Sequence, residues 1–421
     1  MKRVLLLMKS ESYRAEDFVA AAARLGVDLV VGSDEPNMLA SLSAGTALHL
    51  DFGAGEASTE KIVAFHRDRP LDAVVPAEDE GTVLAARAAA ALGLAGNPEE
   101  SVVSGRDKHV FREITRAAGL KTPWFKRYRL REEPAAIAAE VVFPCVLKPL
   151  FLSGSRGVIR ADRPAEFVAA FRRIGAILAR PEVRAQGGEL ADWLLVESYL
   201  PGAEVAVEGI LREGRLHPLV FFDKPDPLEG PFFEETLYVT PSSHPEALQR
   251  RVLAVAADGA RALGLRTGPI HAELRLGGGE PVLLEIAARS IGGRCSRVLR
   301  FGSGISLEEI ILGTALGMVP AEQAREEAAA GVMMIPIPAA GLLAGVAGLE
   351  KARQTPGVEG VEITIPPGQP VVPLPEGRRY LGFIYAKGET PGQVETALRE
   401  AQRRLRFDIR PVEPSAAAGA N

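Results

Sequence analysis

Two glutamates that lie twelve residues apart carry the strongest chemical signal in this sequence. Glu273 and Glu285 lie on two apolar stretches joined by three glycines (277–279), which predict a β-hairpin with the two carboxylates close to opposite each other. Facing carboxylates repel unless a cation lies between them, and oxygen ligands suit Mg²⁺. The spacing therefore predicts a metal site. The alternative is an ion pair of one glutamate with Arg275 or Arg289, while the other glutamate points to solvent.

Lys148 and the loop that follows it have the composition of a phosphate site. The lysine ends an apolar strand predicted at 143–147, and a loop with the letters SGSRG follows at 153–157. Backbone N–H groups and hydroxyls of such a loop can surround phosphate oxygens, and the ammonium supplies a point charge. The alternative is an ordinary strand end and a flexible turn. Lys108, on a charged helix, is by itself expected to be solvated.

The segment LLVESYLPGAE at 194–204 predicts a strand, a Pro-Gly turn and a second strand that opens with Glu204. Backbone groups at such a crossing can bind an adenine edge, and the carboxylate can hold ribose hydroxyls. By itself the segment is only a β-turn-β unit. The turn after the first predicted strand is neither a glycine-rich GxGxxG nor a P-loop. A bound nucleotide would therefore be held by a different kind of binding site.

The elements that must position these groups begin with an α/β unit. In the first hundred residues, apolar runs at 4–7, 27–31 and 71–75 alternate with helical patterns at 15–25 and 82–92. Continuous apolar runs between helices are typical of buried parallel strands, so we predict a small doubly wound sheet.

The remaining chain reads as mixed α+β structure in two further parts, the first with antiparallel strands and the second from about residue 331. The predicted segments are helix 107–118, strands 123–129, 143–148, 157–160, 194–198, 204–211 and 216–222, helix 244–263, strands 270–276 and 281–287, helix 307–316, strands near 333, 361–365 and 380–386, and helix 391–404.

Composition excludes several classes of protein. The 421 residues include 49 Lys and Arg and 54 Asp and Glu, a net charge of −5, which argues against a dedicated nucleic-acid binder. Cys145 and Cys295 have neither metal-ligand spacing nor a disulfide pattern, which predicts a reducing, cytoplasmic location. The uncharged stretch 331–349 has the length of a membrane span, but its glycines and prolines favour a strand followed by a small-residue helix. We therefore expect neither a nucleic-acid nor a membrane partner.

Taken together and in this order, these segments resemble the ATP-grasp superfamily of carboxylate–amine ligases over most of the chain. The letters GPIHAE at 268–273 and EIAAR at 285–289 look most like the L-amino-acid ligases that make dipeptides, as does the stretch 224–242, which resembles a substrate loop of that subgroup. The resemblance implies ATP and Mg²⁺ (one or two ions, with Mn²⁺ as an alternative) and small-molecule carboxylate and amine substrates. It also admits a homodimer, although no interface stripe stands out.

The resemblance implies a three-part architecture and a role for each matched residue. The parts are an N-terminal α/β domain (1–104), an ATP-grasp domain (105–325) with antiparallel sheets that sandwich the nucleotide and a clamping lobe at about 120–200, and a small α+β C-terminal lobe (326–412). Apart from the resemblance, the Ala/Gly/Pro/Ser-rich composition of 413–421 predicts a disordered tail. The implied roles are phosphate binding for Lys108 and Lys148; closure over the phosphates for Ser153, Gly154 and Ser155; the adenine hinge for Glu197, Ser198, Tyr199 and Leu200; ribose binding for Glu204; metal binding for Glu273 and Glu285; stabilisation of charge at the reacting carboxyl carbon for Arg289; and substrate contacts for Lys224, Glu235, Tyr238 and Arg294.

Two departures from the family pattern bear on the substrate. Many superfamily members have Asn two residues after the second glutamate, but this chain has Ala287, as dipeptide ligases do. Some dipeptide ligases have His three residues after the substrate-loop glutamate, and here that residue is Tyr238. Arg294 follows two glycines and could clamp a carboxylate by bidentate geometry, or be an exposed arginine.

The resemblance implies an enzyme that activates a small carboxylate, such as an amino acid, as an acylphosphate and joins it to an amine. Two alternatives remain at this point. One is a purine-pathway-like or bicarbonate-activating enzyme of the same superfamily, and the other is a non-catalytic nucleotide-binding module. The matched Lys148, Glu273, Glu285 and Arg289 favour an enzyme, because a binding module has no need of metal carboxylates.

Overall fold

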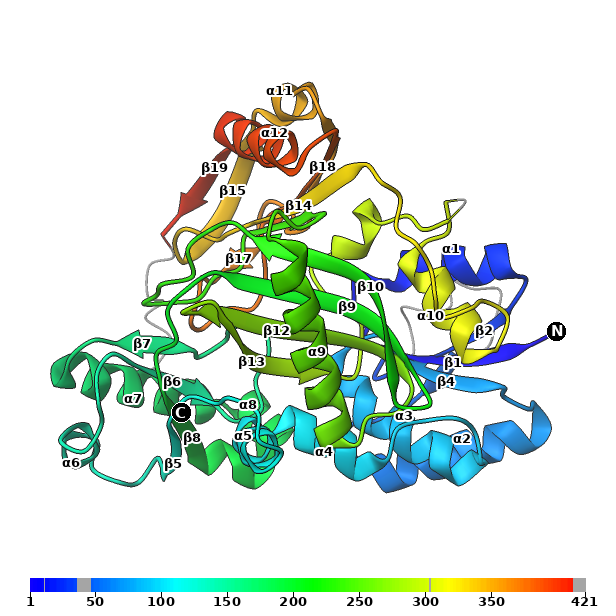
Figure 1. Cartoon of the computed structure of the whole chain (residues 1–421), viewed down its shortest axis with the longest axis horizontal. Helices are drawn as coiled ribbons and strands as arrows, with labels where there is room; N and C mark the ends of the chain where they lie inside the picture. The colour runs from blue at the N-terminus through cyan, green and yellow to red at the C-terminus, as the bar shows by residue number, and fades with distance from the viewer. Residues whose placement is uncertain (11, 36–46, 303, 412–421) are drawn as a thin grey trace, which may run out of the picture.

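The structure, a computed structural model, describes residues 1–10, 12–35, 47–302 and 304–411; the predicted disordered tail at 413–421 lies outside the described residues. Three parts surround a central sheet (Figure 1). The elements are β1 (Arg3–Leu7), α1 (Ala15–Leu25), β2 (Asp28–Ser33), β3 (Ala47–His49), α2 (Gly55–Asp68), β4 (Ala73–Pro76), α3 (Asp79–Leu92), α4 (Glu99–Arg106), α5 (Lys108–Ala117), β5 (Phe125–Arg129), α6 (Pro134–Ala138), β6 (Cys145–Pro149), β7 (Ile159–Ala161), α7 (Pro164–Leu178), α8 (Pro181–Gly187), the 3-10 helix η1 (Gly188–Asp192), β8 (Trp193–Ser198), β9 (Glu204–Arg212), β10 (Arg215–Lys224), β11 (Leu237–Thr240), α9 (Glu246–Leu263), β12 (Gly268–Gly277), β13 (Glu280–Ala287), the 3-10 helix η2 (Cys295–Val298), α10 (Leu307–Ala315), β14 (Ala329–Ile335), β15 (Gly341–Ala347), α11 (Leu349–Arg353), β16 (Val358–Ile363), β17 (Pro370–Val371), β18 (Gly382–Gly388), α12 (Pro391–Arg404) and β19 (Arg406–Arg410).

The N-terminal part is the predicted doubly wound unit. Its parallel strands have the order β3-β2-β1-β4. Along β1, Val4 and Leu6 share a core with α1, whereas Leu5 and Leu7 share a core with α2 and α3 on the opposite face. A strand covered on both faces needs a continuous apolar run, which is why residues 4–7 lack alternation.

The small lobe is an antiparallel sheet with the order β5-β8-β6-β7 (lower left in Figure 1). Helix α7, which the sequence interpretation missed, covers one face of this sheet with buried Phe167, Phe171 and Ile174. Both sheets of the predicted nucleotide sandwich are antiparallel where they meet the site.

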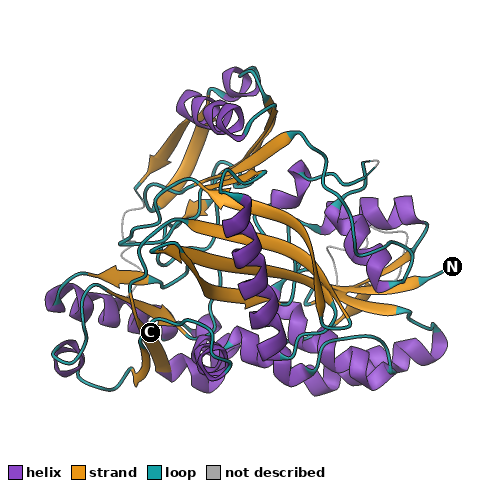
Figure 2. Ribbon diagram, in the orientation of Figure 1, coloured by secondary structure: helices purple, strands orange, loops and turns teal. Residues whose placement is uncertain are grey.

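The central sheet continues into the C-terminal lobe. Its strand order is β13-β12-β9-β10-β11-β14-β18-β16, so hydrogen bonds between β11 and β14 cross the boundary predicted at 325/326. Helix α9 lies over one face of this sheet (Figure 2), where Val205, Leu274 and Ile286 are buried beneath it. The mixed α/β and α+β fold class is confirmed.

The C-terminal lobe adds a second small sheet, with the order β17-β15-β19, and the helices α11 and α12. Here the prediction of a small-residue helix after residue 337 is wrong, because Gly341–Ala347 forms β15, paired with β19. Glycine disfavours a helix, and the carbonyl of Arg410 lies too close to Gly341 for a Cβ atom. Within the described residues, none of the helices combines the length and the apolar character needed to cross a bilayer.

Candidate active site

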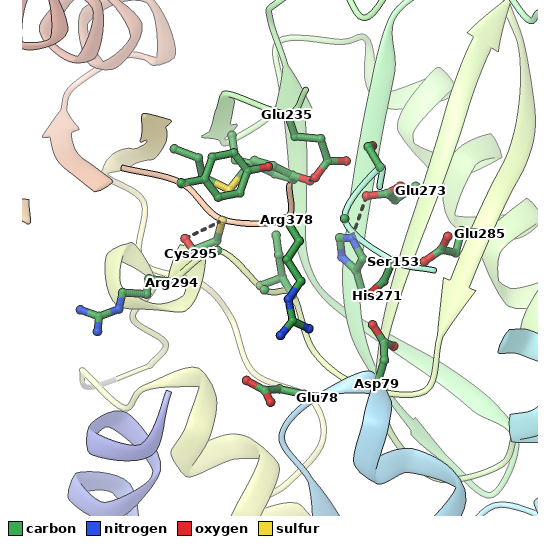
Figure 3. A pocket seen from close by; sticks show the side chains of 18 of the residues that line it. Glu78, Asp79, Ser153, Glu235, His271, Glu273, Glu285, Arg294, Cys295 and Arg378 are labelled. Atoms are coloured by element: carbon green, nitrogen blue, oxygen red, sulfur yellow. Dashed lines mark hydrogen bonds and ion pairs between the residues drawn. The ribbon is translucent and has the colours of Figure 1, made fainter. Parts of the chain in front are cut away.

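The three parts meet around a chamber of about 940 Å³. The loops after β1 and β4 border it, as expected for the carboxyl ends of parallel strands, together with the small lobe, the hairpin β12–β13 and the C-terminal lobe. All the site residues predicted from the sequence line this chamber except Lys224, which is buried behind its wall. Figure 3 shows side chains from these parts converging on the cavity.

A β-bulge sets the two glutamates opposite each other. The ladder of the hairpin runs in regular register from its turn, and the pair Glu273–Glu285 then skips Leu284. Opposed residues of antiparallel strands share a face, so the bulge brings both carboxylates to the chamber side, where a regular ladder would place Leu284 opposite Glu273. The predicted juxtaposition is confirmed.

In the part of the chain that the structure describes, neither glutamate forms the alternative ion pair with Arg275 or Arg289. Arg275 donates from Nε to Glu204 at 2.9 Å. Arg289 donates from Nε and Nη2 to the two carboxylate oxygens of Asp79 at 3.1 and 2.9 Å. Burial lowers the pKa of Arg289, but the adjacent Asp79 outweighs it and raises that pKa further above its ordinary value.

Lys148 belongs to a buried group that we call the Glu197 triad, made of Glu197, Lys148 and Arg112. Lys148 Nζ lies 2.6 Å from one oxygen of Glu197, and the fully buried Arg112 binds the same carboxylate through Nε while it donates to the carbonyl of Leu283 at 2.8 Å. Burial pushes the pKa of Glu197 upward, but the two cations outweigh it and lower the pKa to about 2. Glu197 is therefore a permanent anion that fixes Lys148.

Lys108 is largely buried, not solvated as its helix alone suggested. Its Nζ lies 3.4 Å from Glu285 and donates to the carbonyl of Leu152 at 2.8 Å. This contact joins the second glutamate to the Ser/Gly loop, in which Gly154 and Ser155 both have positive φ. Positive φ at both residues makes this segment a tight turn, and the N–H groups of such turns can surround an anion.

A second charged group, the Lys224 cage, consists of Lys224, Glu204, Glu235 and Glu273. The ammonium of Lys224 lies 2.7, 2.5 and 2.9 Å from the three carboxylates. Burial, and next the charge of Glu273, raise the pKa of Glu235 to about 7. Burial also acts to raise the pKa of Glu273, but Lys224 and His271 hold it well below its ordinary value.

His271 supports the cage from behind. Its Nε2 lies 3.0 Å from the Glu273 oxygen that Lys224 also contacts, and its Nδ1 is bonded to the buried Glu208. Burial opposes the charged imidazole, but Glu208 and Glu273 together raise the pKa of His271 to about 9. Lys224 and His271 thus contact the same oxygen of Glu273, Oε1, and fix this carboxylate at the edge of the chamber.

Substrate residues predicted from the sequence surround the other end of the chamber. Tyr238 donates its hydroxyl to Glu235 at 2.8 Å. Arg294 is not an exposed arginine: it is paired with Glu362 and lies over the rings of Tyr13 and Phe383. Its Nη1 is therefore engaged by Glu362, whereas its buried Nε has no hydrogen-bond partner within the described residues.

Several chamber residues carry no local signal in the sequence. His271 lies in the GPIHAE segment at 268–273, but its partner Glu208 is 63 residues away in the sequence. Glu78 and Asp79 open α3, and Arg378 and Arg379 lie in a Pro/Gly-rich segment that reads as an exposed loop. Only the tertiary fold brings these residues to the chamber.

The donor set fits a divalent cation and a nucleotide. Glu273 and Glu285 offer carboxylate oxygens from opposed positions, and hard oxygen ligands suit Mg²⁺. Lys108, Lys148 and the loop at 153–157 lie along the same chamber and suit phosphate oxygens.

Comparison with known proteins agrees with this geometry. Family models match in three segments: an ATP-grasp N-terminal domain at 19–96, an ATP-grasp domain at 141–298, and the L-amino acid ligase C-terminal domain 2 at 333–410. The alanine–anticapsin ligase of Bacillus subtilis (strain 168) is 28% identical over 271 residues, which span 61% of this chain and 56% of that ligase.

Solved structures extend the likeness to the whole chain. The L-amino acid ligase from Bacillus licheniformis is 26% identical, has a TM-score of 0.83, and is matched over 97% of this chain and 99% of that one. The N5-carboxyaminoimidazole ribonucleotide synthetase from Thermotoga maritima has a TM-score of 0.71 over 97% of this chain and 100% of that one, but at 16% identity it shares the fold alone. The chain thus contains an ATP-grasp domain and is similar to the L-amino acid ligases.

Proposed function

We propose that this protein is an ATP-dependent ligase that activates an amino acid at its carboxyl group and joins it to an amine, releasing ADP and phosphate. The single observation that carries the proposal is the pair Glu273–Glu285, opposed by a bulge at a chamber that Lys108 and Lys148 also line. The likeness to the alanine–anticapsin ligase and to the L-amino acid ligase structure supports the same class.

The phosphates of ATP would lie along Lys108, Lys148 and the Ser153–Gly154–Ser155 loop, and the base beside the segment 197–200. Glu204 would bind the ribose: its oxygens accept from Lys224 and Arg275, and each keeps a second lone pair. Glu273 and Glu285 would hold Mg²⁺, with Mn²⁺ as the alternative. When bound, the ion neutralises phosphate charge.

The first chemical step would transfer the terminal phosphoryl group to the substrate carboxylate, which makes a leaving group where a free carboxylate has none. Phosphoryl transfer depends on positioning and charge neutralisation more than on covalent help from the protein. Cys295 also lines the chamber, but burial raises its pKa well above the ordinary value, so it is a neutral thiol rather than a nucleophile.

The second step would be attack of the amine on the acylphosphate, with phosphate as the leaving group. Arg289 would stabilise the oxyanion, since its pairing with Asp79 across Nε and Nη2 fixes the guanidinium plane. Ser153–Gly157 would exclude water, which otherwise hydrolyses the activated carboxyl group.

The decisive experiment measures ADP release across a panel of amino acids, alone and in pairs, with Mg²⁺. Glu285→Ala should lower the rate at least about a hundredfold, because it removes a metal ligand. Glu280→Ala is the matched control, since Glu280 lies on the same strand but is exposed and forms a surface ion pair with Arg251. Normal turnover by Glu285→Ala would contradict the site.

The same panel separates the remaining candidates. ADP release only with bicarbonate or a nucleotide amine would favour the purine-pathway-like enzyme, whose fold this chain shares. ATP binding in a calorimeter, without hydrolysis for any carboxylate and amine, would favour a non-catalytic module.

A further inference from the structure

The cations that line the chamber are paired with carboxylates, with one exception among the residues that the structure describes. Ten of them have an acidic partner; the pairs are Lys9–Asp34, Arg14–Glu308, Lys108–Glu285, Lys148–Glu197, Arg275–Glu204, Arg289–Asp79, Arg294–Glu362, Arg297–Asp17, Arg353–Glu350 and Arg378–Glu80. Arg379 lines the chamber and has neither an ion pair nor a hydrogen bond in the described part of the chain.

The carboxylates of the lining show the complementary exception. Within the described residues, Glu78 is the lining carboxylate without a cationic ion-pair partner; it accepts from the backbone N–H of Lys9 at 3.4 Å and from the hydroxyl of Ser12. Burial raises its pKa, which is the expected response of a carboxyl group that lacks a counter-ion. Within the described residues, one exposed arginine and one acid of the chamber lining are therefore without an ion-pair partner.

These two residues lie on segments that face each other. Arg379 belongs to residues 372–380, which we call the strap, and Glu78 precedes helix α3. An ion pair between Arg378 Nη1 and Glu80 Oε1 at 3.8 Å joins the segments, and Figure 3 shows Arg378 and Glu78 reaching into the same cavity.

The other end of the strap is fixed to the small lobe. The carbonyl of Pro375 accepts from Gly157 N–H at 2.9 Å, and Arg173 binds both carboxylate oxygens of Glu376 at 2.6 and 2.8 Å. Arg156 Nε also donates to the carbonyl of Glu376 at 3.1 Å. These contacts join the Ser/Gly loop at 153–157 to the strap that carries Arg379, so each segment restrains the other.

We propose that Arg379 selects the amine substrate by binding its carboxylate, while Glu78 faces its amino group. This proposal rests on the proposed function, and it assigns recognition of the amine substrate to a residue of the C-terminal lobe. A guanidinium binds a carboxylate through two parallel hydrogen bonds, and no protein carboxylate competes for Arg379 among the described residues. The strap that carries Arg379 also contacts the phosphate loop, since the carbonyl of Pro375 accepts from Gly157 N–H.

The test compares an amino acid with its carboxamide as the amine substrate, because the carboxamide keeps the amino group but cannot be activated itself. The wild type should prefer the free acid by at least about tenfold in kcat/KM, and Arg379→Ala should bring this preference close to one. Arg379→Lys should retain an intermediate preference, which a merely structural role would not produce. Glu78→Gln should raise KM for acid and carboxamide alike.

Arg353→Ala is the matched control, since this chamber arginine is already paired with Glu350 and should leave the preference unchanged. An Arg379→Ala protein that keeps the wild-type preference would overturn the proposal. Thermal shift separates its failure from that of the ligase reaction. If no turnover is seen, a free acid that raises the melting temperature of the wild type but not of Arg379→Ala still supports carboxylate binding by Arg379. Equal thermal shifts in both proteins refute the proposal.

Discussion

The Glu197 triad and the Lys224 cage solve the problem of buried charge in opposite ways. In the triad, one carboxylate lies between two cations, Arg112 and Lys148, and its pKa falls to about 2. In the cage, three carboxylates share one ammonium, and the pKa of Glu235 rises to about 7, through burial and then through its neighbour Glu273.

The difference indicates which kind of ligand charge each region of the chamber can bind. The triad has a surplus of positive charge, which suits phosphate oxygens, whereas the cage and Glu285 have a surplus of negative charge, which suits a divalent ion or an ammonium group. A chamber with opposite surpluses at neighbouring places can bind a nucleotide with its metal ion and an amino acid side by side.

The largest effect should come from the triad. Glu197→Gln should lower the free energy of unfolding at pH 7 by on the order of 3 kcal/mol, since it leaves two buried cations without their anion. The folded pKa lies below the unfolded one, so the contribution of Glu197 is present above about pH 4.5 and is lost as the pH falls toward 2. Urea denaturation at several pH values measures this. Exposed Glu140→Gln is the control, and an equally small loss for both variants would contradict the interpretation.

For Glu235 in the Lys224 cage, we predict a change of the opposite sign in the free energy of unfolding. Because the folded pKa of Glu235 is raised, its neutral carboxyl group favours folding; this contribution is complete below about pH 4.5 and is lost as the pH rises through 7. Glu235→Gln should therefore increase the free energy of unfolding at pH 8.5 by about 1–3 kcal/mol and give a smaller gain at pH 5. Urea curves at the two pH values, with Glu229→Gln as an exposed control, test it. A net loss at pH 8.5 would mean that the ion pair with Lys224 outweighs the crowding.

The smallest effect should come from the strap, whose ion pair lies outside both buried groups. Arg173 and Glu376 have side chains 45% and 22% exposed, so water screens their attraction. A double-mutant cycle with Arg173→Gln and Glu376→Gln should give a coupling free energy of less than about 1 kcal/mol. A coupling above about 2 kcal/mol would show that the strap is clamped as tightly as the buried pairs.

Most of the fold could be predicted because apolar patterns act locally. The run at residues 4–7 indicates its own burial, and the helix 391–404 was predicted with the bounds that α12 has. Helix α7 and strand β15 were missed or misassigned, because their segments have small or apolar residues whose structure is decided by what they pack against.

The site divides in the same way. The opposed glutamates could be predicted from their spacing of twelve residues around a glycine turn. The bulge at Leu284, which brings Glu285 directly opposite Glu273, could not be predicted. The partners that set the electrostatics come from afar: Asp79 is 210 residues from Arg289, and Arg112 is 85 residues from Glu197. Sequence spacing carries no information on such pairs, so the triad and the cage became visible only in the fold.

The sheet that runs from the centre into the C-terminal lobe has a consequence for any shortened form of this protein. Strand β11 is buried along its whole length and gives one of its sides to β14. A fragment that stopped at residue 325 would contain Lys148 and both opposed glutamates, yet it would bare an apolar edge with unpaired N–H and C=O groups. Such an edge recruits a strand from another copy, so this fragment would self-associate through β11 instead of staying monomeric.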